Sequence, residues 1–155
     1  MKVVEWLENV QKLDFAVDEL SGQLQEVRER AMKCTAGEMD GMPHAVSFVS
    51  DKVGNGVVNI VVMEARIAAK IDQYVDYRDD VIDNLMKLPP MQCKVLYLHY
   101  VGHFDEDNGT KKYMSWTEIA RYLGYSVMQV GRIKKAALKN LENMMGDVIE
   151  CYSIS

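Results

Sequence analysis

The feature that most constrains the fold is a heptad spacing of apolar residues near the N-terminus. Between Val4 and Lys33 the chain has no proline and one glycine, Gly22. The apolar positions alternate between three and four residues apart and comprise Val10, Leu13, Val17, Leu20, Leu24, Val27 and Ala31. Such a spacing predicts a long amphipathic helix with a narrow apolar seam. Because a narrow seam buries little by itself, this helix needs a partner helix.

A second stretch with the same spacing supplies the partner. Its seam begins at Val57 and runs to Leu88, with polar residues at Glu64 and Arg78. The intervening residues 34–56 contain Gly, Pro, Ser and Asp, which is typical of a loop, and their role is open. We therefore expect residues 1–88 to form a helical hairpin or coiled coil. The sequence leaves open whether its arms pair within one chain or between chains.

The Leu88-Pro89-Pro90 segment marks the end of the second helix, because proline lacks the backbone donor that a helix needs. A second domain, residues 89–145, is expected to follow, with residues 146–155 as a C-terminal tail. Its first helix should run from Met91 to Val101 and lead into a polar loop. The fold class predicted for the whole chain is all-α.

Two capping boxes predict the next two helices. Ser115 is followed three residues later by Glu118, and Ser126 by Gln129, which is the pattern of a side-chain cap at a helix N-terminus. The first helix should run to Leu123 and end at Gly124, and the second should reach about Met144. Two helices joined by a short turn with a glycine predict a helix-turn-helix.

Charge is distributed unevenly along the chain. The formal net charge is −5. Residues 111–141, however, hold seven basic residues and one acidic residue, a local balance of +6, whereas residues 1–88 hold ten basic and sixteen acidic residues. A basic helix-turn-helix in an otherwise acidic chain predicts double-stranded DNA as the partner.

Two resemblances rest on these residues. The segments LPPMQCKVLYLHYV, SWTEIARYLGYS and VMQVGRIKKAALKNLE, within Leu88–Glu142, resemble region 4 of bacterial sigma factors. The whole chain, with GMPH at Gly41–His44 and SDKVGN at Ser50–Asn55, resembles a family of small regulators of phages and prophages of Gram-positive bacteria. The resemblance implies a phage-type DNA-binding transcription regulator whose recognition helix enters the major groove.

The recognition helix supplies most of the expected DNA contacts. Sigma region 4 has polar residues after the turn, whereas this chain has Val127 and Met128. Met128 suits a thymine methyl group, Gln129 suits adenine and Arg132 suits guanine, while lysines suit phosphates. The candidate DNA-binding residues are Thr117, Tyr125, Ser126, Met128, Gln129, Arg132, Lys134, Lys135 and Lys139.

Other functions have weaker support in the sequence. No catalytic set, cofactor motif or metal-ligand spacing is legible, so we expect neither an enzyme nor a metal or cofactor. The three cysteines are unclustered and no apolar run is long enough to span a bilayer, which predicts a cytoplasmic protein of a bacterial host cell and no membrane association. An interaction module that binds RNA polymerase or another regulator, a homodimer formed through the coiled coil, and a DNA-packaging subunit remain alternatives.

Overall fold

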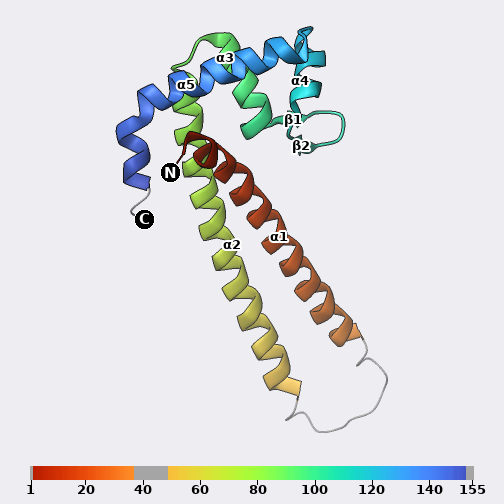
Figure 1. Ribbon diagram of the computed structural model, residues 1–155. Coiled ribbons are helices and arrows are strands. Elements are labelled where there is room, and N and C mark those ends of the chain that lie inside the picture. Colours follow the sequence, from red (N-terminus) through yellow and green to blue (C-terminus); the bar gives the residue numbers. More distant parts are fainter. Residues whose placement is uncertain (1, 37–48, 153–155) are drawn as a thin grey trace. The chain divides into compact units, whose positions relative to one another are not determined.

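The computed structural model describes residues 2–36 and 49–152, and over these residues the chain is mostly helical (Figure 1). The predicted helical class is therefore confirmed. The elements in chain order are α1 (Val3–Ala36), α2 (Val49–Leu85), α3 (Pro90–Leu96), the π-helical turn η1 (Tyr97–Val101), β1 (His103–Asp105), β2 (Thr110–Lys112), α4 (Trp116–Leu123) and α5 (Val127–Tyr152). The Gly41–His44 motif lies outside the described residues.

The chain divides into two compact units. One unit combines Met1–Lys12 with Val75–Ser155, and the other is Leu13–Tyr74. The domain boundary expected at Leu88 thus lies within the first unit. The first α1 residues belong to the same unit as the C-terminal helices, although the sequence places them in the hairpin.

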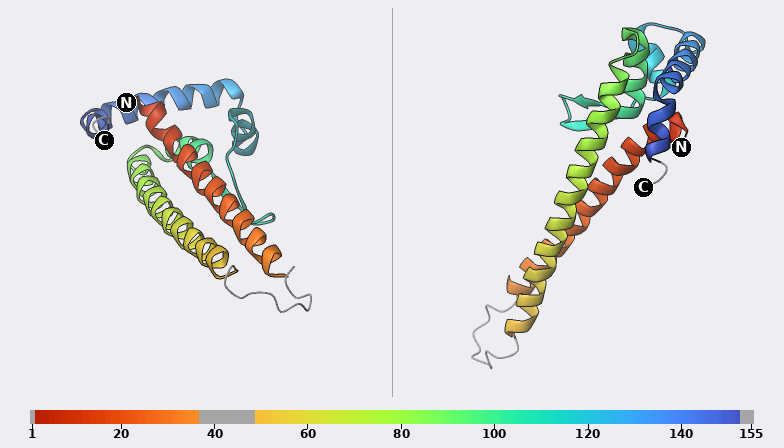
Figure 2. Two further views of the ribbon diagram at one scale, coloured as in Figure 1. Left: turned by 90° about the horizontal axis from the view of Figure 1, so that it is seen from below. Right: turned by 90° about the vertical axis from the view of Figure 1, so that its left-hand side faces the viewer.

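The unit Leu13–Tyr74 is a hairpin of α1 and α2, which run side by side in opposite directions within one chain (Figure 2). The predicted α1 seam is correct, since each of its residues in this unit is buried or half-buried. Across the hairpin, the guanidinium of Arg28 forms an ion pair with the carboxylate of Glu64. Glu64, one of the two polar residues in the predicted α2 seam, is therefore paired with a charge on the other arm.

The loop expected at residues 34–56 is shorter than predicted. Helix α1 continues through Ala36 and α2 begins at Val49, so Ser50 and Asp51 lie inside the helix rather than capping it. No proline occurs between Val49 and Leu88, and the glycines in the first turns of α2 weaken a helix by about 1 kcal/mol each without breaking its hydrogen bonds. Residues 49–56 are therefore helical, although their composition is typical of a loop.

The first unit is built around the N-terminal turns of α1. Trp6, Leu7 and Val10 are fully buried. The Tyr77 hydroxyl donates a hydrogen bond of 2.9 Å to the carbonyl of Trp6, and the two ring centroids are 6.3 Å apart. Burial raises the pKa of the Tyr77 hydroxyl, and the nearby carboxylate of Asp80 raises it further, while the hydrogen bond from Asn9 lowers it. The start of α1 is thereby fixed to the end of α2.

A short β-hairpin stands where the sequence predicted a polar loop, within an otherwise helical chain. Strands β1 and β2 are antiparallel, with Phe104 opposite Lys111. The turn between them is closed by Asp105, whose carboxylate accepts hydrogen bonds from the Asp107 amide and the Asn108 side chain. Asn108-Gly109, with Gly109 at φ 62°, is the sequence signal for such a turn.

The segment expected to be a C-terminal tail, residues 146–155, is helical as far as Tyr152. Helix α5 runs to Tyr152, well beyond the predicted end near Met144. Gly146 is the one glycine after Met144 and no proline follows, so the helix hydrogen bonds continue.

Candidate nucleic-acid interface

Helices α3, α4 and α5 share one small apolar core. Its buried members are Val95, Leu98, Ile119, Ala120 and Val130, with Met114, Trp116, Leu123 and Ile133 packed against them. Ala137 and Leu141 extend the buried face of α5. Ile119, Ala120 and Leu123 on α4 and Val130, Ile133, Ala137 and Leu141 on α5 are therefore buried or half-buried, and the opposite face of α5 is exposed to solvent.

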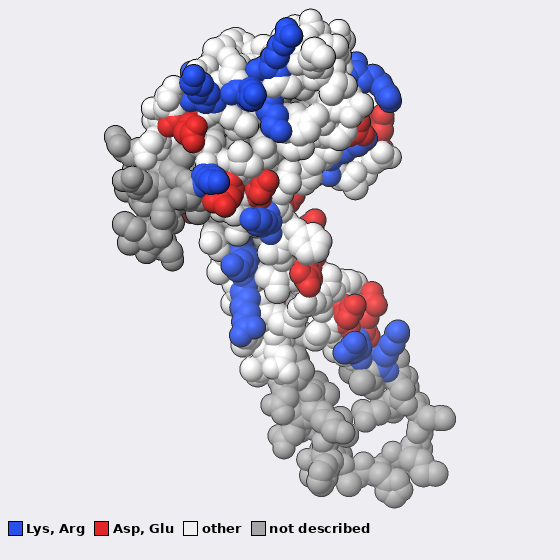
Figure 3. All heavy atoms as spheres, in the orientation of Figure 1, with Lys and Arg blue, Asp and Glu red and all other residues white. Residues whose placement is uncertain are grey.

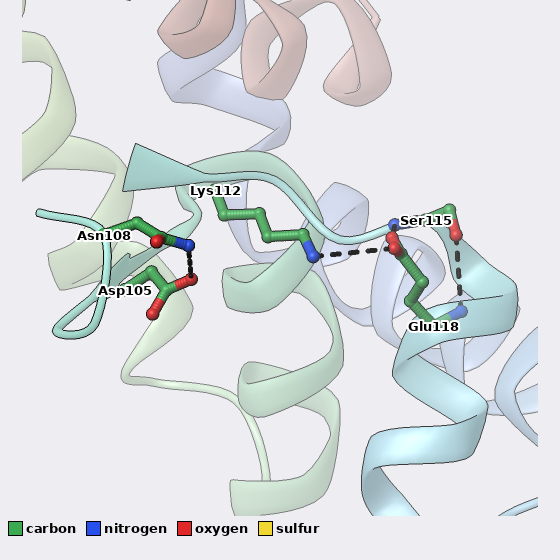
Figure 4. Close-up of polar contacts among 5 residues, drawn as sticks. All are labelled: Asp105, Asn108, Lys112, Ser115 and Glu118. Carbon is green, nitrogen blue, oxygen red and sulfur yellow. Dashed lines mark hydrogen bonds and ion pairs between the residues drawn. The ribbon is translucent and has the colours of Figure 1, made fainter. Parts of the chain in front are cut away.

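The predicted capping box at the start of α4 is confirmed (Figure 4). The Ser115 hydroxyl accepts a hydrogen bond of 3.3 Å from the Glu118 amide, and the Glu118 carboxylate accepts one of 2.8 Å from the Ser115 amide. These backbone and side-chain bonds with Ser115 lower the pKa of Glu118, and the Lys112 ammonium, 3.8 Å away, adds to the effect. The single acidic residue of the basic segment is thus engaged in the cap.

Gly124 ends α4 and sets the direction of α5. Its φ of 72° and ψ of 25° place it in the left-handed region, where glycine carries no steric penalty from a Cβ atom. The Tyr125 amide donates a hydrogen bond of 2.9 Å to the Ala120 carbonyl across this turn. The glycine predicted to end α4 is confirmed in that position.

A second capping box starts α5. The Ser126 hydroxyl accepts a hydrogen bond of 3.2 Å from the backbone amide of Gln129. In return, Gln129 Oε1 accepts from the Ser126 amide at 2.9 Å and from the Ser126 hydroxyl at 3.2 Å. The side-chain oxygen of Gln129 is therefore used in the N-terminal cap of α5.

One face of α5 is both exposed and basic. Met128, Arg132, Lys135 and Lys139 are spaced four, three and four residues apart, so they share one side of the helix. All four are exposed, and the buried residues Val130, Ala137 and Leu141 lie on the opposite side. We call these four residues the α5 face; it extends about 16 Å along the helix at 1.5 Å per residue.

The charge distribution follows the same pattern in space. In Figure 3 Lys and Arg spheres gather over the part of the first unit where α5 lies, with few Asp or Glu spheres among them. Over the hairpin arms the two colours are mixed. The positive surface is thus local, as the count by segment indicated.

Lys134 differs from the other basic residues of α5. It is half-buried, and its ammonium lies 4.2 Å from the centroid of the Trp116 ring in a cation–π contact. The His99 ring stacks on the same indole, with centroids 3.8 Å apart and planes at 23°. Lys134 therefore holds α5 against α4, and less of its charge is available to a ligand than at Lys135.

The stack continues toward α1. His99 Nδ1 lies 2.7 Å from the Met114 carbonyl oxygen, and since a carbonyl only accepts, Nδ1 carries the hydrogen. The Gln11 side chain donates a hydrogen bond of 2.7 Å to the His99 carbonyl. Burial lowers the pKa of His99, and the nearby ammonium of Lys134 acts in the same direction. His99 and Trp116 are residues of this region that the sequence did not single out.

The remaining predicted contacts are Thr117, at the start of α4, and Tyr125 and Ser126, in the turn before α5. Thr117, Tyr125 and Ser126 are exposed, as are the neighbouring apolar side chains of Tyr122 and Val127. Eight of the nine predicted residues are therefore exposed near the start of α4 and along α5, with Lys134 as the exception. Together they give a surface that is apolar at the turn and cationic along α5.

Comparison of the chain with models of known protein families, with curated proteins and with solved structures finds no match. Among the described residues, no three His, Cys, Asp or Glu side chains are grouped so that they could hold a metal ion. Within the same residues, every helix is too short or too polar to cross a membrane.

Proposed function

We propose that the chain is a phage-type DNA-binding transcription regulator in which α4 and α5 act as a helix-turn-helix. The observation that carries the proposal is the α5 face, where three exposed cations follow Met128 on the side of the helix opposite the core. A helix of this kind fits the major groove, with its first turn toward base edges and its later cations near phosphates. The resemblance of Leu88–Glu142 to sigma region 4 supports the same assignment.

The test is a binding titration of the full-length chain on mixed-sequence duplex DNA at several salt concentrations. The double variant Arg132→Ala, Lys135→Ala should bind more weakly and show a salt dependence shallower by about 0.9 in the slope of log K against log salt, since Lys135 is its phosphate contact and each lost phosphate contact removes about 0.9. The matched control is Arg66→Ala, Lys70→Ala on α2, which removes the same charge from the hairpin.

The control separates a local contact from a general charge effect. We expect the α2 double variant to bind with the wild-type slope. Equal losses in the two double variants, or no loss in either, would contradict the assignment of the α5 face. Far-ultraviolet circular dichroism of each variant checks that the helices remain folded.

A second candidate function is an interaction module that binds RNA polymerase or another regulator without reading DNA. It is favoured by the exposed apolar side chains at the turn, of which Tyr122 is 61% exposed and Val127 is 54% exposed. Co-purification with polymerase, together with no salt-sensitive binding to duplex DNA, would select it over the first.

A homodimer formed through the hairpin is part of the proposal. In the unit Leu13–Tyr74, the buried hydrophobic residues among those described are Leu24 and Ile67, whereas four valines on α2 (Val57, Val58, Val61 and Val62) are 48–59% exposed. This valine patch is uncharged, so the same patch of a second copy can cover it across a two-fold axis without like-charge repulsion. Val61→Glu should convert a dimer into a monomer in sedimentation analysis, whereas a wild-type monomer would reject the dimer.

A further inference from the structure

The first turn of α5 presents a single long apolar side chain to solvent on the α5 face. Met128 is 70% exposed, and its sulfur lies 4.0 Å from the Arg132 guanidinium. Gly131, on the same side of the helix, has no side chain, and a Cβ atom placed there would meet nothing within 4 Å. Met128 and Arg132 are therefore the side chains of this turn that reach outward from the α5 face.

Gln129 is removed from the set of base readers by its role in the cap. Recognition of adenine by glutamine uses the side-chain oxygen as an acceptor and the side-chain nitrogen as a donor. Both lone pairs of Gln129 Oε1 are already used, by the amide and the hydroxyl of Ser126. Reading adenine would require α5 to lose this part of its N-terminal cap.

The residues around Met128 determine which kind of partner surface can bind over it. The thioether is apolar, but Arg132, Lys135 and Lys139 follow it on the same face. A purely apolar protein surface would bury these cations without partners, which is costly. A thymine in the major groove offers a methyl group with phosphates on either side, so it matches both parts of the face.

Resting on the proposed function, we infer that Met128 is a specificity-determining residue that reads the C5-methyl group of a pyrimidine in duplex DNA. Arg132, one helical turn further on, reads a guanine on the same face. Four residues are about one helical turn, so the two side chains lie one above the other on the face and reach different bases along the groove. The cations beyond Arg132 hold the backbone.

The experiment removes the methyl group and nothing else. Duplexes are enriched from a random-sequence library with the full-length wild-type chain, and each thymine of the enriched site is replaced in turn by deoxyuridine, which pairs identically. At the thymine that faces Met128 we expect an affinity loss of about four-fold, the value of one buried methyl group. Replacing that thymine by 5-methylcytosine, with guanine opposite, should retain more affinity than replacing it by cytosine.

Three variants assign the effect to Met128. Met128→Ala should bind the thymine and deoxyuridine duplexes equally, while Met128→Leu should retain the difference because leucine is also apolar. The matched control Met144→Ala changes another exposed methionine of α5 and should retain the full difference.

The outcomes separate this inference from the proposed function. Salt-sensitive, sequence-selective binding with no deoxyuridine effect at any thymine would overturn the role of Met128 and leave the DNA-binding function standing. A deoxyuridine effect that persists in Met128→Ala would also overturn it. The absence of any binding to duplex DNA would overturn both.

Discussion

Two glycines seven residues apart should respond in opposite directions to the same substitution. Gly124 has a φ of 72°, whereas Gly131 lies inside α5 with helical geometry. At both positions an added Cβ atom would have no neighbour within 4 Å, so the effect of alanine is conformational and not steric. This pair therefore isolates the contribution of the backbone.

The expected magnitudes follow from these conformations. Alanine in the left-handed region costs roughly 1–2 kcal/mol, partly offset by about 0.4–1 kcal/mol from a less flexible unfolded chain. Gly124→Ala should therefore lower the free energy of unfolding by about 1 kcal/mol. Gly131→Ala should raise it by about 0.5–1 kcal/mol, the usual gain from alanine in a helix interior.

Urea unfolding followed by tryptophan fluorescence is the appropriate assay. Trp6 and Trp116 both belong to the first unit, so the signal reports on the unit that contains the turn. With a slope of about 2 kcal/mol per molar urea, Gly124→Ala should lower the midpoint by about 0.5 M and Gly131→Ala should raise it by about 0.3–0.5 M. Gly124→Asn should lose less than alanine, because asparagine tolerates the left-handed region.

The sign of the two shifts decides the outcome. If Gly124→Ala left the midpoint unchanged or raised it, the left-handed turn between α4 and α5 would be refuted. If Gly131→Ala lowered the urea midpoint, Gly131 would have a packing role, which its place on an open helix face does not predict.

Three further predictions concern contacts of the first unit. Ser126→Ala should lower the free energy of unfolding by about 1 kcal/mol in the same urea assay, because α5 loses its N-cap. Tyr77→Phe should cost a similar amount, about 1 kcal/mol, because the part-buried carbonyl of Trp6 loses its donor. Since the pKa of His99 is lowered below 6.5, the folded state binds fewer protons than the unfolded chain just below that pH. The melting temperature should therefore fall as the pH drops through 6.5, and it should fall less steeply in His99→Gln.

The parts of the fold that sequence predicted correctly depend on local chemistry. The seam of α1, both capping boxes and the glycine after α4 each involve residues within a few positions of one another, where helix geometry dictates the contacts. The length of α5 was underestimated because composition near Gly146 resembles a helix end. The β-hairpin was missed although Asn108-Gly109 was visible, since strands of three residues carry too little alternation to recognise.

The candidate site shows more clearly which contacts the sequence alone does not predict. The exposure of Arg132, Lys135 and Lys139 followed from the spacing of the buried residues on α5. The contact of Lys134 with Trp116 did not, because it joins residues 18 positions apart on two different helices. Nor does a sequence show that the Gln129 oxygen already has both its lone pairs engaged by Ser126.

The composition of the first unit has a consequence for synthesis on the ribosome. Trp6, Leu7 and Val10 are synthesised before Val75, yet they are buried in a unit whose other segment begins at that residue. At 5–20 residues per second, the 65 residues from Val10 to Val75 take roughly 3–13 s, so these apolar side chains wait at least that long for the rest of their unit. The hairpin Leu13–Tyr74 is completed first, so the nascent chain carries an uncovered tryptophan ahead of a finished hairpin. The later segment of the unit then packs with the earlier turns of α1.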